Sequence, residues 1–460
     1  MRLPLEPFRI KVVEPVKKIG RENREELIQK AGYNVFKLPA EAIFIDLLTD
    51  SGTSAMSDRQ WAGIMQGDES YAGCRNFYHL KETVEELLGY PFVLPTHQGR
   101  AAESVFFKTL LNKNSVVPNN IHFDTTRANV EYLGATALDC VIDEGLNPRL
   151  EHPFKGNLDP EKLKNAIEKH GTENIPLVMI TITNNSGGGQ PVSMENIRRI
   201  SGICHDHGIP LFFDAARFAE NAYFIKLREK EYQNKSIKEI VREMFSYADG
   251  CLMSAKKDAL VNIGGFIAVS DEELYLKLQN LLILHEGFLT YGGLAGRDLE
   301  AISRGLHDVL EEDYLQYRIE HTAYLGNLLI EAGIPVVRPF GGHAIYIDAK
   351  EIFPHIPQSQ FPGQALTVEL YRQAAIRAVE IGSLMFAAKD PATGEWKYPE
   401  LDLVRLAIPR RVYTASHLDY VAGALREILQ RKEEISGYRI VYEPPFLRHF
   451  TAVLEPVERS

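Results

Sequence analysis

Short apolar runs alternate with segments of helical periodicity between about residue 91 and residue 270. The apolar runs indicate short strands, and the segments between them place apolar residues at the spacing of an α-helix. Alternation of this kind predicts an α/β domain with a mostly parallel sheet. We expect strands at 92–94, 116–117, 137–141, 177–181, 211–213, 250–253 and 265–269, and helices at 100–110, 160–170, 194–207 and 236–248.

The chain before this alternation looks irregular. Three prolines fall within the first 15 residues, and a charged helix (21–31) and an apolar stretch (42–48) follow them. An extended N-terminal segment often wraps around a partner subunit, although a loose arm would show the same pattern. Two more helices, at 57–65 and 80–88, are expected before the first strand.

A second domain is predicted near the C-terminus, because a long helical region runs from residue 299 to residue 331 and an α+β pattern follows it. We therefore expect an N-terminal arm that completes part of the small domain (1–56), a large domain (57–310) and a small C-terminal domain (311–460). In the small domain, the pattern predicts strands near 336, at 344–347 and at 403–408, helices at 365–378 and 416–431, and a solvated loop at 389–399.

The length and composition fit this division. A chain of 460 residues is too long for one compact core, and its 45% hydrophobic and 25% charged residues are typical of a soluble globular protein. The formal net charge of −11 argues against nucleic acid as the main partner. Because the N-terminus shows no signal pattern and no apolar run reaches membrane-spanning length, we expect a cytoplasmic protein without a membrane partner.

The four cysteines (Cys74, Cys140, Cys204 and Cys251) are scattered along the chain and form no CxxC pair. This spacing is typical of reduced thiols in a cytoplasmic protein. It argues against both a disulfide framework and a zinc site.

One stretch carries a candidate nucleophile. The apolar run 251–253 ends at Ser254, and two lysines, Lys256 and Lys257, follow it. A lysine that forms a Schiff base must be held at a fixed point, partly desolvated and near other cations, so that its pKa falls. Taken by itself, the same pattern is more often a solvated loop.

Four other clusters follow predicted strands, and each has a simpler reading when taken alone. A helix begins at Gln98, Gly99 and Arg100, and its N-terminus could bind a phosphate. The simpler reading is an ordinary strand-to-helix turn. Phe123 could stack on an aromatic ring, and Asp124 could serve as an acid or base in the same pocket. The simpler reading is a turn that Asp124 caps.

The other two clusters have the same ambiguity. Asn185 comes just before three glycines that allow close approach of a ligand, or that form a flexible loop. Asp214 could keep a pyridine nitrogen protonated, with Arg217 at the ring oxygen, or it could cap a helix. All the clusters together, in this order, resemble the aspartate-aminotransferase-like (fold type I) pyridoxal phosphate enzymes.

Longer blocks spread over nearly the whole chain carry a more specific resemblance. They are Phe44–Gly52, Pro95–Arg100, Gly188–Ser193, Glu220–Lys226, Met253–Asp258, Tyr291–Leu294, Gly341–His343 and Arg448–Thr451. On these blocks the sequence resembles the β-eliminating amino-acid lyases, the family of tryptophanase and tyrosine phenol-lyase. Blocks of this length are far more specific than a short motif.

The resemblance implies a set of site residues. Lys257 would hold pyridoxal 5'-phosphate and act as the catalytic base, with Phe123 stacked on the ring and Asp214 at its nitrogen. The implied phosphate ligands are Gln98, Gly99, Arg100, Ser254 and Lys256, with Lys256 also expected to lower the pKa of Lys257; Asn185 and Arg217 would bind the ring oxygen, and Thr49, Ser51, Asn185 and Arg405 the substrate carboxylate.

The family also implies a monovalent cation, usually K+, and a homotetramer. Gly52, Glu69 and Asn262 are the implied ligands. A set of oxygen donors without cysteine is consistent with a hard cation.

Three positions favour tryptophan as the substrate, cleaved to indole, pyruvate and ammonium. By resemblance, Asp124, Ile381 and His449 match tryptophanase, whereas tyrosine phenol-lyase has Thr, Arg and Phe there. An indole N–H is a donor that suits a carboxylate or imidazole, and Phe450 would also contact the substrate. A phenol oxygen that loses its proton would instead prefer arginine.

Two other residues have roles that stay open. Tyr71 is the candidate acid that protonates indole C3, although it could be a core tyrosine; His343 could lie at the cleft or be structural. The chain departs from the family at Asn129, where both lyases carry histidine. A hydrogen bond to Asp124 from His122 could replace the missing one.

Competing functions remain open at this point. A tyrosine phenol-lyase, an aminotransferase or a decarboxylase would share the cofactor site, and relatives also process S-alkyl cysteines and serine. A cofactor-free binding protein would show no visible absorbance after purification.

Overall fold

The central sheet has the strand order β2-β8-β7-β6-β5, in which β8 alone runs against the other four strands. In the computed structural model, which describes residues 3–390 and 393–458, the parallel pair β3–β4 lies beside β5. This is the mostly parallel, mixed sheet that the alternation predicts. The strands are β2 (Phe92–Thr96), β3 (Val116–Asn119), β4 (Thr136–Asp139), β5 (Val178–Thr181), β6 (Leu211–Asp214), β7 (Gly250–Met253) and β8 (Gly265–Val269).

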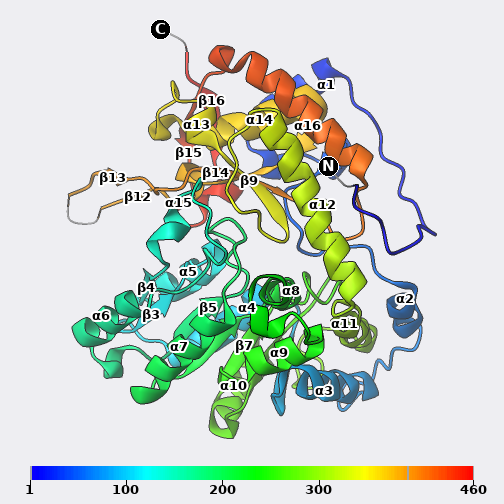
Figure 1. Cartoon of the computed structure of the whole chain (residues 1–460), viewed down its shortest axis with the longest axis vertical. Helices are drawn as coiled ribbons and strands as arrows, with labels where there is room; N and C mark the ends of the chain where they lie inside the picture. The colour runs from blue at the N-terminus through cyan, green and yellow to red at the C-terminus, as the bar shows by residue number, and fades with distance from the viewer. Residues whose placement is uncertain (1–2, 391–392, 459–460) are drawn as a thin grey trace.

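Helices cover both faces of this sheet because its strands are apolar on both sides (Figure 1). On β5, Val178 and Ile180 pack into one core, whereas Met179 packs into a second core on the opposite face. The helices of this region are α2 (Asp58–Ile64), α3 (Arg75–Leu88), α4 (Gly99–Leu110), α5 (Asp124–Tyr132), α6 (Pro160–His170), α7 (Met194–Asp206), α8 (Phe218–Arg228), α9 (Ile237–Phe245), α10 (Glu272–His285) and α11 (Gly296–Asp308).

Helix α12 (Glu312–Glu331) joins the sheet region to a separate α+β region. Its first turn packs Tyr314 and Leu315 into the core of the sheet region, and its later turns pack Leu325 and Leu329 into another core. The helix therefore belongs to both cores. The expected division near residue 310 falls just before it.

The N-terminal segment packs with the C-terminal region rather than with the sheet. Ile28, Val35 and Ile45 share a core with residues from 324 to 454, and β1 pairs in parallel with β10. The elements of this region are α1 (Arg21–Lys30), β1 (Ile45–Asp46), β9 (Ala344–Asp348), α13 (Ala349–Ile352), α14 (Pro362–Ala374), β10 (Ile376–Arg377), β11 (Val379–Ile381), α15 (Ser383–Phe386), β12 (Ala388–Lys389), β13 (Trp396–Lys397), β14 (Leu403–Ala407), α16 (Ala415–Gln430), β15 (Tyr438–Tyr442) and β16 (Val453–Pro456).

Two local predictions in this region are wrong. The helix expected at 365–378 ends at Ala374, because Ala375 adopts a left-handed conformation (φ 52°) and Ile376 then pairs with Ile45. The expected loop at 389–399 contains β12 and β13, which pair and project from the body (Figure 1). Its residues 391–392 lie outside the described residues.

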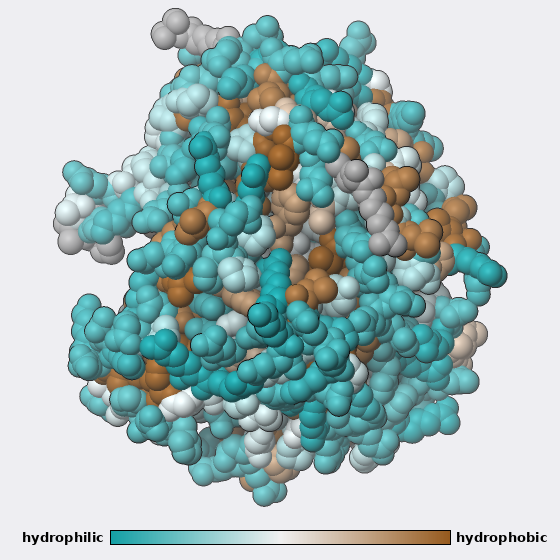
Figure 2. All heavy atoms as spheres, in the orientation of Figure 1, coloured by the Kyte–Doolittle hydropathy of each residue, from teal (hydrophilic) through white to brown (hydrophobic). Residues whose placement is uncertain are grey.

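The face of the molecule seen in Figure 2 is mostly hydrophilic. Apolar side chains gather at its right-hand edge, where the N-terminal segment runs. Val12 and Val13 in this segment are 87% and 77% exposed. Within the described ranges, none of the helices combines the length and apolarity needed to cross a membrane.

Candidate active site

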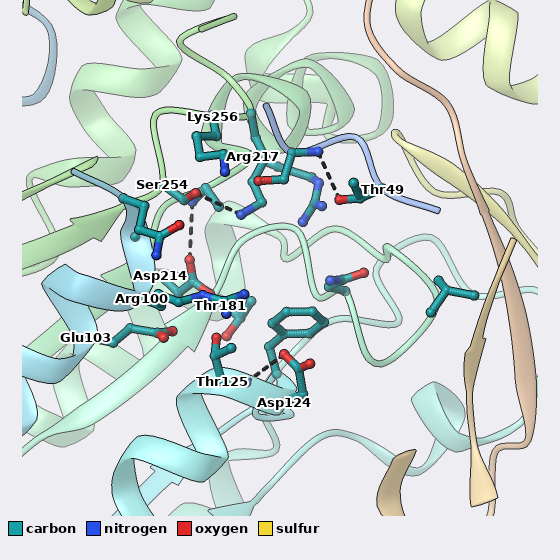
Figure 3. Close-up of a pocket in the computed structure, with 18 of the residues that line it drawn as sticks. Thr49, Arg100, Glu103, Asp124, Thr125, Thr181, Asp214, Arg217, Ser254 and Lys256 are labelled. Carbon is teal, nitrogen blue, oxygen red and sulfur yellow. Dashed lines mark hydrogen bonds between the residues drawn. The ribbon is translucent and has the colours of Figure 1, made fainter. Parts of the chain in front are cut away.

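A cavity of about 250 Å³ opens at the carboxyl ends of the parallel strands (Figure 3). Thr181 ends β5, Asp214 ends β6 and Met253 ends β7, and all three line the cavity. Arg405 and His449 line it from the C-terminal region. Ligands of such sheets bind beyond the carboxyl ends of the strands, so this is the expected place for a site.

Lys257 lines this cavity and is partly buried. Its Nζ donates a hydrogen bond to Ser254 Oγ at 2.9 Å. Burial lowers the pKa of Lys257 to about 8, and the Arg217 guanidinium contributes to this shift. Arg217 is therefore a neighbouring cation that lowers this pKa, and the expected contribution of Lys256 stays a prediction. A lysine amine with this pKa is partly deprotonated near neutral pH and can act as a nucleophile.

The start of α4 offers groups that suit a phosphate. Its N-cap, Gln98, makes no side-chain capping bond, so the first turn of the helix can receive an anion. A Cβ on Gly99 would lie 2.6 Å from Ser254 Cβ, so only glycine lets these two segments approach so closely. Arg100 and Lys256 also line the cavity, and their charges suit a phosphate.

The cavity between this helix and the C-terminal region suits an aromatic ring that carries a protonated nitrogen. Phe123 lines it just before α5, and Asp214 lines it at the end of β6. Asp214 Oδ1 accepts a hydrogen bond from Ala216 N at 3.3 Å, and no described cationic side chain lies within 4.0 Å of it. Burial raises the pKa of Asp214, and a cationic ring nitrogen would relieve this cost.

Asp50 is a buried carboxylate that the sequence analysis missed. Arg217 donates to it from Nε at 3.0 Å and from Nη2 at 2.7 Å, and Arg410 donates from Nη1 at 2.9 Å. Burial by itself would raise the pKa of Asp50, but these two guanidinium groups hold it well below its ordinary value. Arg217 lines the cavity, and its Nη1 has no partner among the described residues, so it can donate to a ligand oxygen.

Asn185 and Arg405 form the second polar part of the lining. Arg405 donates from Nη1 to Asn185 Oδ1 at 3.0 Å and from Nη2 to Leu48 O at 2.9 Å, while its Nε has no partner. No described carboxylate lies within 4.0 Å of Arg405, which leaves this guanidinium ready for one. His343 lies behind Asn185, fully buried and outside the lining.

Of the residues expected to recognise the substrate side chain, some line the cavity and one does not. His449 Nε2 lies 3.1 Å from Asp124 Oδ2, and both residues line the cavity together with Phe450. Ile381 is buried behind the wall and does not line the cavity, whereas its strand neighbour Val379 does.

Glu103 is a further acid in the lining that the sequence analysis missed. It lies on α4 and accepts hydrogen bonds from Thr126 Oγ1 at 2.5 Å and Asn129 Nδ2 at 3.4 Å. Burial raises the pKa of Glu103 to about 7, and Asp214 adds to the shift. A lone glutamate within a helix carries no motif, so only the fold reveals that it faces the cavity.

Two expected groups lie apart from the cavity of their own chain. Tyr71 is 71% exposed and stacks near Phe288 and Tyr291, and it does not line the cavity. Glu69 accepts hydrogen bonds from Gly296 N and from Arg297 at the start of α11. Neither residue therefore completes the site within one copy of the chain.

The implied cation ligands are only partly assembled. Asn262 Nδ2 donates to Gly52 O at 3.0 Å, and no hydrogen bond joins either residue to Glu69 among the described residues. Thr49 and Ser51 line the cavity beside Gly52. In the described ranges, no three His, Cys, Asp or Glu side chains lie close enough to hold a metal ion.

His122 does not replace the histidine missing at position 129. Its Nδ1 lies 2.7 Å from Asp139 Oδ1, and its Nε2 has no partner. Asp124 instead pairs with His449, so the C-terminal segment supplies the imidazole.

Comparison with known proteins gives consistent matches over nearly the whole length. Residues 46–424 match the model of the beta-eliminating lyase family. The chain is 55% identical to a tryptophanase from Salinibacter ruber, with 98% of this chain and 95% of that protein aligned. It is 51% identical to a tyrosine phenol-lyase from Symbiobacterium sp., with 98% of each aligned. The threonine aldolase of Leishmania major has a similar fold (TM-score 0.57, 15% identity, covering 84% of this chain and 99% of that chain).

Proposed function

The chain belongs to the beta-eliminating lyase family, and we propose that within this family it is a K+-activated tryptophan indole-lyase. It is a pyridoxal phosphate-dependent carbon–carbon lyase that acts on an aromatic amino acid. In the proposed reaction, L-tryptophan and water give indole, pyruvate and ammonium.

The pairing of Asp124 with His449 is the observation that carries the choice of tryptophan. Both residues are at least 94% buried and line the cavity at an Nε2–Oδ2 distance of 3.1 Å. An indole N–H can donate to this pair. A phenol that leaves as an anion would be repelled by the carboxylate, and position 381 carries isoleucine rather than arginine.

The lining of the cavity supports the proposed binding residues. Pyridoxal phosphate, when bound, supplies an electron sink for negative charge at the substrate Cα. Gln98, Gly99, Arg100, Ser254 and Lys256 would hold its phosphate, Phe123 its ring face, and Asn185 and Arg217 its ring oxygen. Arg405 would bind the substrate carboxylate through its guanidinium, with Thr49 and Ser51 beside it.

Three groups hold or move protons in the proposed reaction. Lys257 removes the proton from the substrate Cα, since its buried amine is partly neutral near pH 8. Asp214 keeps the ring nitrogen of the cofactor protonated. Tyr71 is the proposed acid at indole C3.

Tyr71 would act in the cavity of a second copy, because it is exposed and outside the cavity of its own chain. The same short loop carries Glu69, which would join Gly52 and Asn262 of another copy at the K+ site. This arrangement needs at least two copies of the chain, and the homotetramer is part of the proposal.

The test is product formation by the purified protein loaded with pyridoxal phosphate. We expect indole and pyruvate from tryptophan, a higher kcat/KM for tryptophan than for tyrosine, and lower activity when NaCl replaces KCl. Lys257→Ala should lose both the visible absorbance of the bound cofactor and the elimination. A higher kcat/KM for tyrosine would overturn the choice of tryptophan.

Tyrosine is the second candidate substrate, because a tyrosine phenol-lyase aligns over 98% of the chain at 51% identity. Phenol release distinguishes it directly. Formation of a 2-oxo acid without indole or phenol would instead indicate transamination.

A further inference from the structure

Two separate segments form the apolar wall around the Asp124–His449 pair. Val379 and Met385 come from the segment of β11 and α15, and His449 and Phe450 come from a 3₁₀ helix, Arg448–Phe450. More than 60 residues of chain separate the two segments, since the contacts between them span |i−j| of 64 and 65. The shape of the wall therefore depends on what ties them together.

Arg448 makes that connection. Its Nε donates to Leu384 O at 2.7 Å, and its Nη2 donates to Ser383 O at 2.8 Å. The side chain is only 10% exposed, so water competes little for these bonds. A planar guanidinium can hold two successive carbonyl oxygens at once, whereas an ammonium group lacks this fork.

Glu380 binds the backbone N–H groups of the same short helix, α15. Its Oε1 accepts from Leu384 N at 2.7 Å, and its Oε2 accepts from Met385 N at 3.1 Å. Glu380 is 2% exposed and lies on β11, which is part of the sheet β11-β14-β9. The turn that carries Met385 is thus fixed by its N–H groups to a sheet and by its carbonyl groups to Arg448.

The outer side of Arg448 is also fixed. Its guanidinium lies 5.0 Å from the centre of the Trp396 ring, and Nη1 lies 3.2 Å from Glu443 Oε2. Trp396 belongs to the projecting pair β12–β13 (Figure 1). On the far side of the 3₁₀ helix, Asn34 Nδ2 donates to His449 O at 3.1 Å.

We propose that Arg448 is a positioning residue for substrate specificity, which fixes the distance between Met385 and the His449–Phe450 pair. The proposal rests on the proposed lyase function. Arg448 does not line the cavity, so we expect it to act through the wall rather than by contact with a ligand. Its effect should fall on the large aromatic leaving group, and should spare a substrate whose leaving group is too small to reach the wall.

The experiment compares Arg448→Lys with the wild type and with Arg439→Lys. Arg439 is the matched control, because it lies on β15 with its side chain 69% exposed and pairs with Glu455. We expect Arg448→Lys to lower the ratio of kcat/KM for tryptophan over tyrosine by about tenfold, mainly through KM. The kcat for S-methyl-L-cysteine should stay within about twofold of the wild type. Arg439→Lys should change neither quantity.

A second measurement uses binding without chemistry. The cofactor-loaded proteins are titrated with 3-(indol-3-yl)propanoate and with 3-(4-hydroxyphenyl)propanoate, and Kd is read from the visible absorbance. Arg448→Lys should reduce the preference between the two acids by the same factor. An unchanged preference, or an equal loss with S-methyl-L-cysteine, would show that Arg448 has no selective role.

The two proposals fail in different ways. A wild-type protein that prefers tyrosine would contradict the proposed function, while a shift in preference in Arg448→Lys would still support the role of Arg448. If Arg448→Lys does not fold, Trp396→Leu replaces it, because this change removes only the ring beneath the guanidinium. We then expect the ratio of kcat/KM for tryptophan over tyrosine to fall, as in Arg448→Lys. An unchanged ratio would overturn the proposal.

Discussion

Arg217 and Asp50 form a buried, two-pronged ion pair, with Nε–Oδ2 at 3.0 Å and Nη2–Oδ1 at 2.7 Å. Asp50 comes from the N-terminal segment and Arg217 from the turn before α8, and the pair is 167 residues apart in sequence. The pairing orients the guanidinium so that Nη1 is left for the cavity. Asp50, from the N-terminal segment, thereby sets the orientation of the Arg217 guanidinium in the sheet region.

Asp50→Asn should lower both stability and activity. The change leaves Arg217 and Arg410 without their shared carboxylate in the interior, and breaking a buried pair costs about 3–5 kcal/mol. We expect a lower free energy of unfolding in urea and weaker binding of pyridoxal phosphate. Asp58→Asn is the control, because Asp58 pairs with Lys11 on the surface. Equal behaviour of the two variants would contradict the role given to Asp50.

Lys257 should react with pyridoxal phosphate at a lower pH than an ordinary lysine. Burial, with a contribution from Arg217, lowers its pKa to about 8, so its neutral amine predominates above that pH. The rate at which cofactor-free protein gains visible absorbance on adding the cofactor should rise with pH, with a midpoint near pH 8. A midpoint near the ordinary lysine value of about 10.4 would disprove this.

His449→Phe should shift the substrate preference toward tyrosine. The change removes the partner of Asp124 and leaves that buried carboxylate with Thr125 N as its hydrogen-bond donor. We expect the ratio of kcat/KM for tryptophan over tyrosine to fall by about tenfold. His205→Phe, at an exposed position on α7, should leave the ratio unchanged. No change in His449→Phe would remove the basis for choosing tryptophan.

Glu103→Gln should change how stability depends on pH in the cofactor-free protein. Burial raises the pKa of Glu103 to about 7, with Asp214 adding to the shift and Lys257 opposing it. Between about pH 4.5 and pH 7 the folded state therefore binds more protons than the unfolded state, so stability falls as pH rises. Glutamine cannot ionise, and the variant should lose less stability over this range.

The size of this difference follows from the shift. A carboxyl pKa raised from 4.5 to about 7 corresponds to about 3 kcal/mol of stability lost at and above pH 7. Urea unfolding at pH 4.5 and at pH 7 measures it in both proteins. Parallel pH dependence in the two would show that Glu103 does not titrate in this range.

The sequence predicts the parts of the site that follow strands. Lys257 and Asp214 are predictable because a polar residue at the end of an apolar strand reaches the edge of the sheet where ligands bind. Gln98 and Arg100 are predictable because they open a helix. For the same reason, the strand–helix alternation foretells the order of elements through the sheet region.

The residues that the sequence does not reveal depend on long-range packing. Glu103 belongs to no motif, and only the fold brings it to the cavity. Asp50 lies in the block Phe44–Gly52, but only the fold shows that it pairs with Arg217. The sequence predicts Ile381 in the lining, but strand β11 places Val379 there and buries Ile381 in the same apolar cluster. The end of α14 was misplaced because Ala375 gives no glycine or proline signal.

The pairing of β1 with β10 has a consequence for how the protein is made. Ile45 and Asp46 leave the ribosome more than 300 residues before Ile376 and Arg377, their partners in the strand pair. At a synthesis rate of about 5–20 residues per second, the N-terminal segment waits for roughly 20–70 s without its partner. During that time its apolar side chains are exposed to chaperones and to other nascent chains. Synthesis in two pieces, split after the sheet region, should therefore leave the first piece with an incomplete cavity and a tendency to aggregate.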